Sequence, residues 1–149
     1  MKKLILILSF LCISHIVASQ YQKHIIGTPY KLDDMQVAQY DFPNSMTYED
    51  AKYVCSKLGE GWRLPTKYEL NNIYQNKNQI KGFVSQLQIL NDSEYYTDPN
   101  IYYWSDTEYD ELYVWIQGFT NTTIAITERS SYLFVRAVNT EFTIFKFRF

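Results

Sequence analysis

The stretch of residues 61–69 constrains the fold of this chain more than any other, because it fixes where one helix begins and how the chain enters it. Its sequence is Gly-Trp-Arg-Leu-Pro-Thr-Lys-Tyr-Glu. Pro65 keeps the residue before it extended. Thr66 and Glu69 have the spacing of a capping box, in which each side chain accepts a hydrogen bond from a backbone N–H of the first turn. Apolar residues then follow at helical spacing and predict a helix to about Asn76: Leu70, Ile73 and Tyr74.

A second helix is predicted just upstream, from Tyr48 to Leu58. Thr47 and Asp50 stand three residues apart at its start, which resembles a capping box with Asp in the position of Glu. Gly59 follows the last turn, where a residue with positive φ commonly ends a helix. The apolar stripe of this helix is predicted to contain Ala51, Val54, Cys55 and Leu58.

The second half of the chain changes to a pattern typical of β-strands. Short runs rich in β-branched and aromatic residues, at 102–104, 112–119, 123–127 and 132–138, are separated by turns that contain Asp, Asn, Ser or Thr. We expect antiparallel strands in these runs. Residues 145–149 alternate Phe with Lys and Arg, which predicts a terminal strand. We expect it at a sheet edge, where its charges disfavour pairing with a further strand.

The first nineteen residues have the organisation of a secretory signal peptide. Lysines precede an apolar run that is far shorter than the roughly 20 residues needed to span a bilayer, and small residues precede Gln20. We therefore expect cleavage between Ser19 and Gln20, and a protein that is secreted, periplasmic or at the cell surface. The alternative is a lipoprotein acylated at Cys12, which Leu11 disfavours because a small residue is needed there.

Residues 20–149 match the commonest size of a single domain, and we predict one domain without a membrane span over this range. They contain 12 Lys and Arg against 16 Asp and Glu, a net charge of −4. This balance argues against nucleic acid as a partner, because phosphate binding needs concentrated positive charge. Cys55 is the only cysteine in this range, so the domain can form no internal disulfide. We expect Cys55 to be a small buried hydrophobic residue.

Four segments together resemble a known bacterial family. Residues 37–44, 61–70, 102–108 and 134–138 are similar to the domain of unknown function 1566, also called the Lcl C-terminal domain, and the Gly-Trp-Arg-Leu-Pro-Thr run is the most specific part. The resemblance implies an α+β fold of the C-type lectin-like class, with two helices packed on antiparallel β-strands and a long irregular loop region. It implies no known chemistry. The family occurs in exported and surface proteins, and one adhesin among them binds glycosaminoglycans.

The resemblance also indicates which residues form the framework of the family and where this chain departs from the family's usual pattern. The connection before Tyr102 and the end of the chain after Asn139 are both longer than is usual in the family. Ala137 stands where some members have a Cys that could pair with one in the first helix. We expect Trp62, Trp104 and Trp115 to lie in the core, and Arg63 and Arg136 to bridge backbone carbonyls or acids. The expected framework residues are Trp62, Arg63, Leu64, Pro65, Thr66, Glu69, Trp104 and Arg136.

The sequence offers little for catalysis. His24 is the only histidine in residues 20–149, and nothing in its spacing places it beside Cys55 or an activated Ser. The clustered His and Cys ligands of a zinc site are also missing from the sequence. The run Arg-Leu-Pro-Thr-x-x-Glu also resembles formylglycine-generating sulfatase-modifying enzymes, but the paired late cysteines of those enzymes are absent. We therefore expect a protein that is not an enzyme.

A ligand is expected at the long polar connection from Gln86 to Ile101. Rings near this loop could stack on a sugar or a peptide. The run Asp98-Pro99-Asn100 resembles the Glu-Pro-Asn motif with which C-type lectins hold Ca²⁺ and sugar together, but the partner Trp-Asn-Asp motif is absent and a simple turn is the favoured interpretation. The candidate ligand-binding residues are Tyr95, Tyr96, Asp98, Asn100 and Tyr102.

An acidic turn at residues 106–111 adds a candidate metal site. Asp106, Glu108 and Asp110 place hard oxygen ligands close together, so they could hold Ca²⁺ or meet a cationic partner. Solvated charge on a surface turn is the default interpretation of these residues.

Two functions follow from these patterns. The first is an exported, non-enzymatic, lectin-like binding module for a glycan or a surface partner, with a role in adhesion and calcium as a possible cofactor. The alternative is a structural subunit of a surface complex that pairs with another chain through its C-terminal strand.

Overall fold

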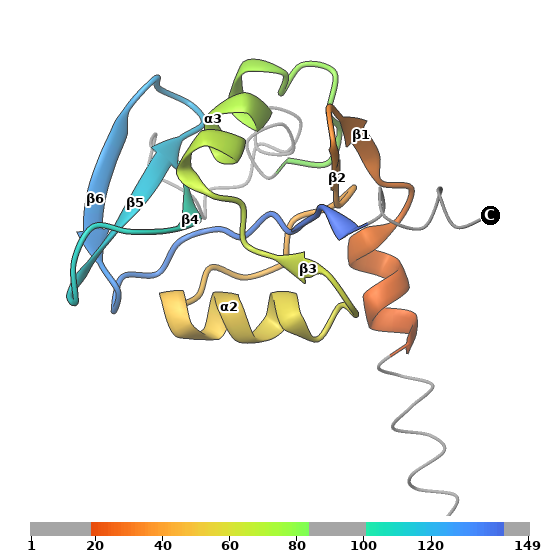
Figure 1. Ribbon diagram of the computed structural model, residues 1–149, viewed down its shortest axis with the longest axis horizontal. Helices are drawn as coiled ribbons and strands as arrows, with labels where there is room; N and C mark the ends of the chain where they lie inside the picture. The colour runs from red at the N-terminus through yellow and green to blue at the C-terminus, as the bar shows by residue number, and fades with distance from the viewer. Residues whose placement is uncertain (1–18, 84–100, 142–149) are drawn as a thin grey trace, which may run out of the picture.

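The computed structural model describes residues 19–83 and 101–141, and Figure 1 shows how their helices and strands are arranged. Three segments are helical: residues 19–26, α2 (Tyr48–Ser56) and α3 (Lys67–Gln75). In this part of the chain, no helix is long and apolar enough to cross a membrane. Residues 1–18 of the predicted signal peptide and the predicted strand at 145–149 lie outside the described residues.

The first sheet is small and joins segments from both ends of the domain. Its four antiparallel strands are ordered β1 (Tyr30–Leu32), β2 (Met35–Val37), β7 (Val138–Asn139) and β3 (Trp62–Arg63). Strand β7 therefore holds the Gly-Trp-Arg-Leu-Pro-Thr run against the N-terminal hairpin.

The second sheet is longer and has three antiparallel strands in chain order. They are β4 (Tyr102–Glu108), β5 (Tyr113–Gly118) and β6 (Ile124–Glu128). The register between β4 and β5 shifts between Trp104 and Glu108, which marks a β-bulge, whereas β5 and β6 pair without a break. Strand β6 lies on the outer side of this sheet in Figure 1.

The capping signals form as predicted. Thr66 Oγ1 accepts a hydrogen bond from the Glu69 backbone N–H, and Glu69 accepts one from the Thr66 N–H at 2.7 Å. Thr47 caps α2 by accepting from the Asp50 N–H. Gly61 has φ +77°, and a Cβ there would lie 2.7 Å from Asn139 Oδ1, so the turn before Trp62 requires glycine. Both predicted helices are confirmed, one or two residues shorter than expected.

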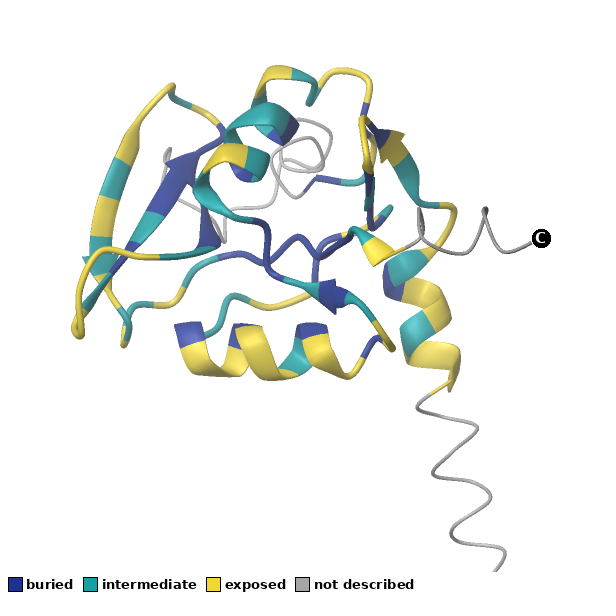
Figure 2. Cartoon of the chain, viewed as in Figure 1, coloured by how far each residue is buried: buried dark blue, intermediate teal, exposed yellow. Residues whose placement is uncertain are grey.

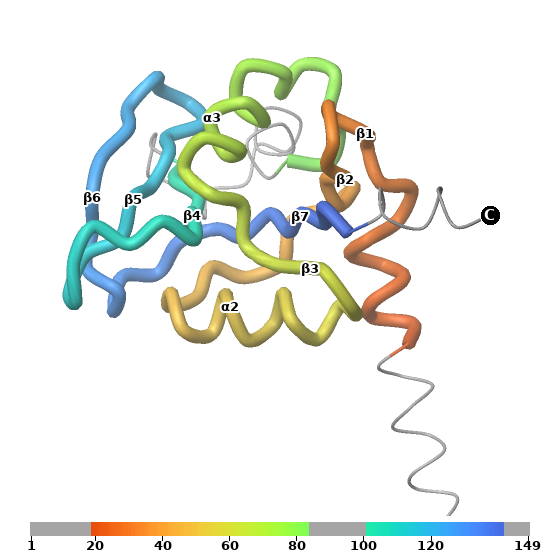
Figure 3. Tube along the Cα trace, viewed as in Figure 1, coloured from red at the N-terminus to blue at the C-terminus, as the bar shows by residue number. Residues whose placement is uncertain are grey.

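The segment 133–138 runs through the middle of the molecule, between α2 and α3 (Figure 3). It is extended, but only β7 and two isolated bridges at Leu133 and Phe134 are regular. The prediction of a continuous strand over 132–138 is therefore wrong in part. The segment instead bonds to several neighbours in turn, through Val135 O to Phe42 N and Ala137 O to Ala38 N.

Alternation along the extended chain divides the core into two clusters. Tyr103 and Trp104 are consecutive in β4, so their side chains point to opposite sides. Trp104 packs in the cluster that contains Tyr48, Ala51 and Cys55 of α2. Tyr103 packs in the cluster that contains Leu70 and Ile73 of α3. Figure 2 shows that buried residues follow the centre of the molecule, while β6 is exposed or half-buried along its length. The α+β class predicted from the sequence is thus confirmed.

Candidate functional site

Most of the predicted ligand-binding residues lie outside the residues that the structure describes. Tyr95, Tyr96, Asp98 and Asn100 lie outside the described residues. Tyr102 begins β4, is half-buried, and packs against the core cluster of α2. Its hydroxyl accepts a hydrogen bond from Asn121 Nδ2 at 3.4 Å.

The expected framework residues hold the junction between the two helices. Trp62, Leu64 and Trp104 are buried. The Arg63 guanidinium binds Glu69 in a two-pronged ion pair, with both N–O distances at 2.8 Å, and donates to the carbonyl of Leu64. Burial by itself raises the pKa of Glu69, but hydrogen bonds from Arg63 and Thr66 lower it overall. The Glu69 carboxylate therefore stabilises the fold through these contacts and is not available to bind a ligand.

Trp115 departs from its predicted place in the core. It is half-buried on the face of β5 that lies toward α3. The Lys67 ammonium lies 3.7 Å from the centre of its ring, and Tyr109 meets it edge-on at 5.7 Å between ring centres. Successive side chains in β5 face opposite sides of the sheet, so Trp115 shares its face with Tyr113.

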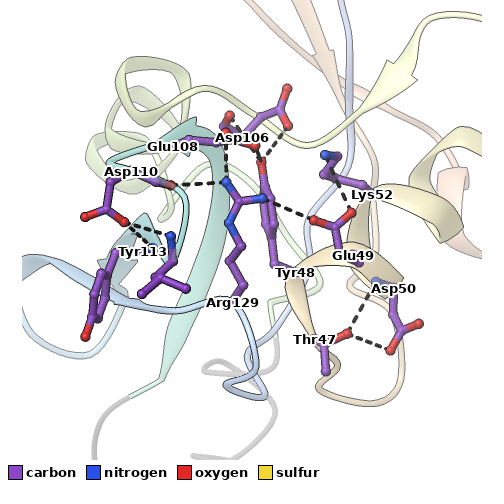
Figure 4. Close-up of polar contacts among 11 residues, drawn as sticks. Thr47, Tyr48, Glu49, Asp50, Lys52, Asp106, Glu108, Asp110, Tyr113 and Arg129 are labelled. Carbon is purple, nitrogen blue, oxygen red and sulfur yellow. Dashed lines mark hydrogen bonds and ion pairs between the residues drawn. The ribbon is translucent and has the colours of Figure 1, made fainter.

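The acidic turn meets the start of α2 in a network of polar contacts (Figure 4). The Tyr48 hydroxyl lies 3.3 Å from Asp106 Oδ1 and 3.3 Å from Glu108 Oε1. Arg129 bridges the same region, at 2.8 Å from Glu108 and 3.3 Å from Glu49. Asp110 Oδ1 accepts hydrogen bonds from the backbone N–H groups of residues 112 and 113, both at 2.8 Å.

These contacts shift the pKa values of the network in different directions. Burial raises the pKa of Asp106 above its usual value, although the charge of Lys52 and the hydrogen bond from Tyr48 oppose the shift. The hydrogen bond from Arg129 lowers the pKa of Glu108. Burial, followed by the charges of Asp106 and Glu108, raises the pKa of Tyr48, so its hydroxyl stays protonated and donates hydrogen bonds.

The three carboxylates proposed for calcium do not converge. Asp106 and Glu108 share the Tyr48 hydroxyl, Glu108 is also held by Arg129, and Asp110 turns back to its own loop. Within residues 19–83 and 101–141, no group of three or more His, Cys, Asp or Glu side chains is arranged to hold a metal ion. The geometry therefore gives the calcium hypothesis no support at this turn.

An open pocket of about 330 Å³ adjoins the network where β5 begins and β6 ends. Tyr113 and Glu128 lie directly opposite each other in its wall. The hydroxyl of Ser130 lies 3.3 Å from Glu128 Oε2. The lining residues are Leu112, Tyr113, Glu128, Arg129 and Ser130.

Two other open pockets lie near β1 and do not adjoin the acidic turn. One, of about 290 Å³, is lined by residues that include Tyr30, Gln39 and Gln79. The other, of about 190 Å³, includes Asp33, Asp34 and Glu69. Glu69 is already engaged by Arg63, and Asp33 accepts a hydrogen bond from Asn72 at 2.7 Å. Of these three pockets, the one at Tyr113 adjoins the acidic turn, which the sequence predicts to bind Ca²⁺ or a cationic partner.

Sequence reasoning missed Tyr48, Tyr113, Glu128 and Arg129 as members of this site. Tyr113 had a usable signal, because it alternates with Trp115 along a strand. Arg129 had none, since no spacing rule links it to its acidic partners Glu49 and Glu108, the first of which lies 80 residues away in the chain.

Comparison with known proteins places the chain in a family. No curated protein matches the sequence. The crystal structure of botrocetin is similar in shape, at 11% sequence identity and a TM-score of 0.47, over 75% of this chain and 95% of that chain. The family of the Lcl C-terminal domain matches residues 28–139. The predicted family is thereby confirmed, and the chain belongs to the Lcl C-terminal domain family.

Proposed function

We propose that this protein is an exported, non-enzymatic binding module that takes a neutral or amine-bearing saccharide in the pocket at Tyr113. The observation that carries the proposal is the composition of that pocket. A tyrosine, a leucine, a glutamate, an arginine and a serine line about 330 Å³ of open space.

These groups match the chemistry of a sugar ring. An aromatic side chain offers an apolar face to the C–H face of a sugar, and its polar tip stays hydrated. Planar charged groups such as those of Glu128 and Arg129 form strong hydrogen bonds with hydroxyl groups. A few polar groups in a largely apolar concavity are typical of small-molecule sites.

The charge around the pocket favours some saccharides over others. The Arg129 guanidinium is already paired with Glu49 and Glu108, so it offers little charge to an anion. Glu128 adds a carboxylate to the wall. A sulfated, polyanionic chain would be repelled here, whereas a neutral or amine-bearing sugar would not.

The surroundings of Cys55 support a role outside catalysis. The thiol is buried, and burial followed by the charge of Asp106 raises its pKa. A thiol that stays protonated is a poor nucleophile. Family membership is consistent with a lectin-like binding role and with the adhesion role expected from the family resemblance, and export follows the expectation from the first nineteen residues.

A panel of immobilised neutral, amine-bearing and sulfated saccharides tests the proposal. We expect binding to the first two classes. The substitution Tyr113→Ala removes the ring and should weaken binding about tenfold, which corresponds to about 1.4 kcal/mol. Parallel titrations in calcium and in EDTA test the calcium hypothesis separately.

The matched control is Tyr53→Ala, which removes an exposed ring on α2 that does not line the pocket. Its affinity should equal that of the unaltered protein. If no saccharide binds, or if the Tyr53 and Tyr113 variants bind equally well, the pocket is not a sugar site.

A further inference from the structure

Among the residues that the structure describes, strand β6 is an open edge of the three-stranded sheet. The strand order is β4-β5-β6, and no strand in the described part of the chain pairs with the outer side of β6. In Figure 1 this edge forms one side of the molecule. An open edge presents a row of backbone donors and acceptors to any extended chain that meets it.

The ladder between β5 and β6 shows which backbone groups point outward. The Gly118 N–H donates to Thr123 O at 2.8 Å, and the Arg129 N–H donates to Leu112 O at 3.0 Å. Hydrogen-bonded pairs alternate with non-bonded pairs along an antiparallel ladder. The backbone N–H and C=O groups of Ile124, Ile126 and Glu128 therefore point away from β5, toward a position for a fourth strand.

The side chains at this edge are apolar and exposed. Ile124 is 44% exposed and Ile126 is 38% exposed, and their side chains lie on the same face of the sheet as Trp115 and Gln117. Natural edge strands are commonly protected by Lys, Pro or a bulge. The sequence of β6, Ile-Ala-Ile-Thr-Glu, has no Lys or Pro, and its pairing with β5 has no bulge.

We propose that the β6 edge binds residues 143–149 of a second copy of this chain as an added antiparallel strand. This segment places Phe145, Phe147 and Phe149 on one face of an extended chain. That face matches the alternating Ile124 and Ile126, because aromatic and β-branched side chains pair favourably across strands. The proposal goes beyond saccharide binding and does not depend on it.

Charge supports the same occupant. Residues 142–149 carry Lys146 and Arg148 and no acid, whereas residues 19–141 carry 10 Lys and Arg against 16 Asp and Glu, a net charge of −6. The end of β6 at Glu128 also lies beside the acidic turn at 106–111. A cationic segment is therefore attracted to this side of the molecule.

Geometry favours a second copy over the chain's own segment. Residues 142–149 follow β7, which belongs to the other sheet, and β6 and the end of β7 lie on different sides of the molecule in Figure 1. Donation of a strand from one copy to the edge of the next is a head-to-tail contact, which builds rings or open chains.

Two complementary variants test the proposal in the full chain. Ile126→Pro removes an outward N–H and blocks the edge, while the β5–β6 bonds do not use that group. Phe145→Ser with Phe147→Ser blocks the donated segment. Analytical ultracentrifugation should show unaltered protein forming oligomers that grow with concentration, and each variant alone as a monomer. An equimolar mixture of the two variants should form a dimer that grows no further.

Amide hydrogen exchange provides the second readout. Residues 124, 126 and 128 should gain protection in the mixture and not in either variant alone. Ile126→Lys is a second edge block, and circular dichroism confirms that each variant is folded. If the Phe145/Phe147 variant still forms oligomers, or if the mixture stays monomeric, the proposal is wrong. A monomeric unaltered protein at high concentration would also overturn it, whatever the saccharide panel shows.

Discussion

The Arg136 guanidinium and the Asp41 carboxylate form a buried ion pair, with 2.5 Å between Nε and Oδ1. Arg136 also donates to the carbonyls of Ala38 and Gln39, at 2.8 and 2.6 Å. The Tyr103 hydroxyl donates to the second carboxylate oxygen of Asp41 at 2.6 Å. The pair thus joins β4, the central segment 133–138 and the chain that follows β2.

Replacing Arg136 with Met should destabilise the protein strongly. The change leaves the Asp41 carboxylate buried without its counter-charge, a loss that typically costs about 3–5 kcal/mol. Urea unfolding of the variant measures this change in the free energy of unfolding. The double variant Arg136→Met with Asp41→Leu should recover part of the loss. A single variant within about 1 kcal/mol of the unaltered protein would contradict the expectation.

Replacing Thr66 with Ala should cost about 1 kcal/mol, the usual effect of removing a helix N-cap. The Thr66 hydroxyl accepts the Glu69 N–H, and Ala leaves that donor without a side-chain partner. Thermal unfolding measures the loss. Thr66→Ser is the matched control, because Ser keeps the hydroxyl, and it should unfold close to the unaltered protein. Equal losses in both variants would show that the cap does not set the stability of α3.

Local signals made the framework predictable from sequence. The caps at Thr47 and Thr66 are contacts within three residues, so their spacing alone identifies them. The hairpin of β5 and β6 was also predictable from the sequence, because runs of β-branched residues flank a short polar turn. The family resemblance rested on the same run, residues 61–69, that these local rules explain.

Long-range contacts were not predictable in the same way. The network at Tyr48 joins Asp106, 58 residues away, and no spacing rule links those positions. The pairing of Tyr113 with Glu128 depends on the register of β5 and β6, which a shift of one residue would reverse. The half-buried position of Trp115 depends on Lys67 of α3, so its place outside the core could not be read from its own strand.

Replacing Asp106 with Asn should stabilise the protein at neutral pH. The folded pKa of Asp106 is raised above its usual 3.8, mainly by burial. Below that usual value the carboxyl is protonated in both states. Between pH 3.8 and the raised folded pKa, the unfolded state has released its proton while the folded state still holds it, so the free energy of unfolding falls as the pH rises. Asn keeps an oxygen for the Tyr48 hydroxyl and carries no charge.

Thermal unfolding of both proteins across the acidic to neutral range checks this expectation. The advantage of Asp106→Asn should grow as the pH rises from 3.8 and then level off. Glu69 and Glu108 act in the opposite sense, since their lowered pKa values add stability as the pH rises toward 4.5. Both proteins share those two groups, so the difference between them reports Asp106 together with its charge interaction with Glu108. Parallel stability curves would contradict the assigned shift.

Cys55 should resist alkylation until the protein unfolds. Its side chain is buried in the core cluster of α2, and burial followed by the charge of Asp106 raises its pKa, so the thiolate that reacts is scarce. Iodoacetamide at neutral pH should leave Cys55 unmodified in buffer and modify it fully in urea, as peptide mass mapping reports for that residue alone. Val54→Cys in a Cys55→Ala background places a thiol at the half-buried neighbouring position and should react in buffer. Rapid labelling of Cys55 in the folded protein would mean that this side of α2 opens far more readily than its packing implies.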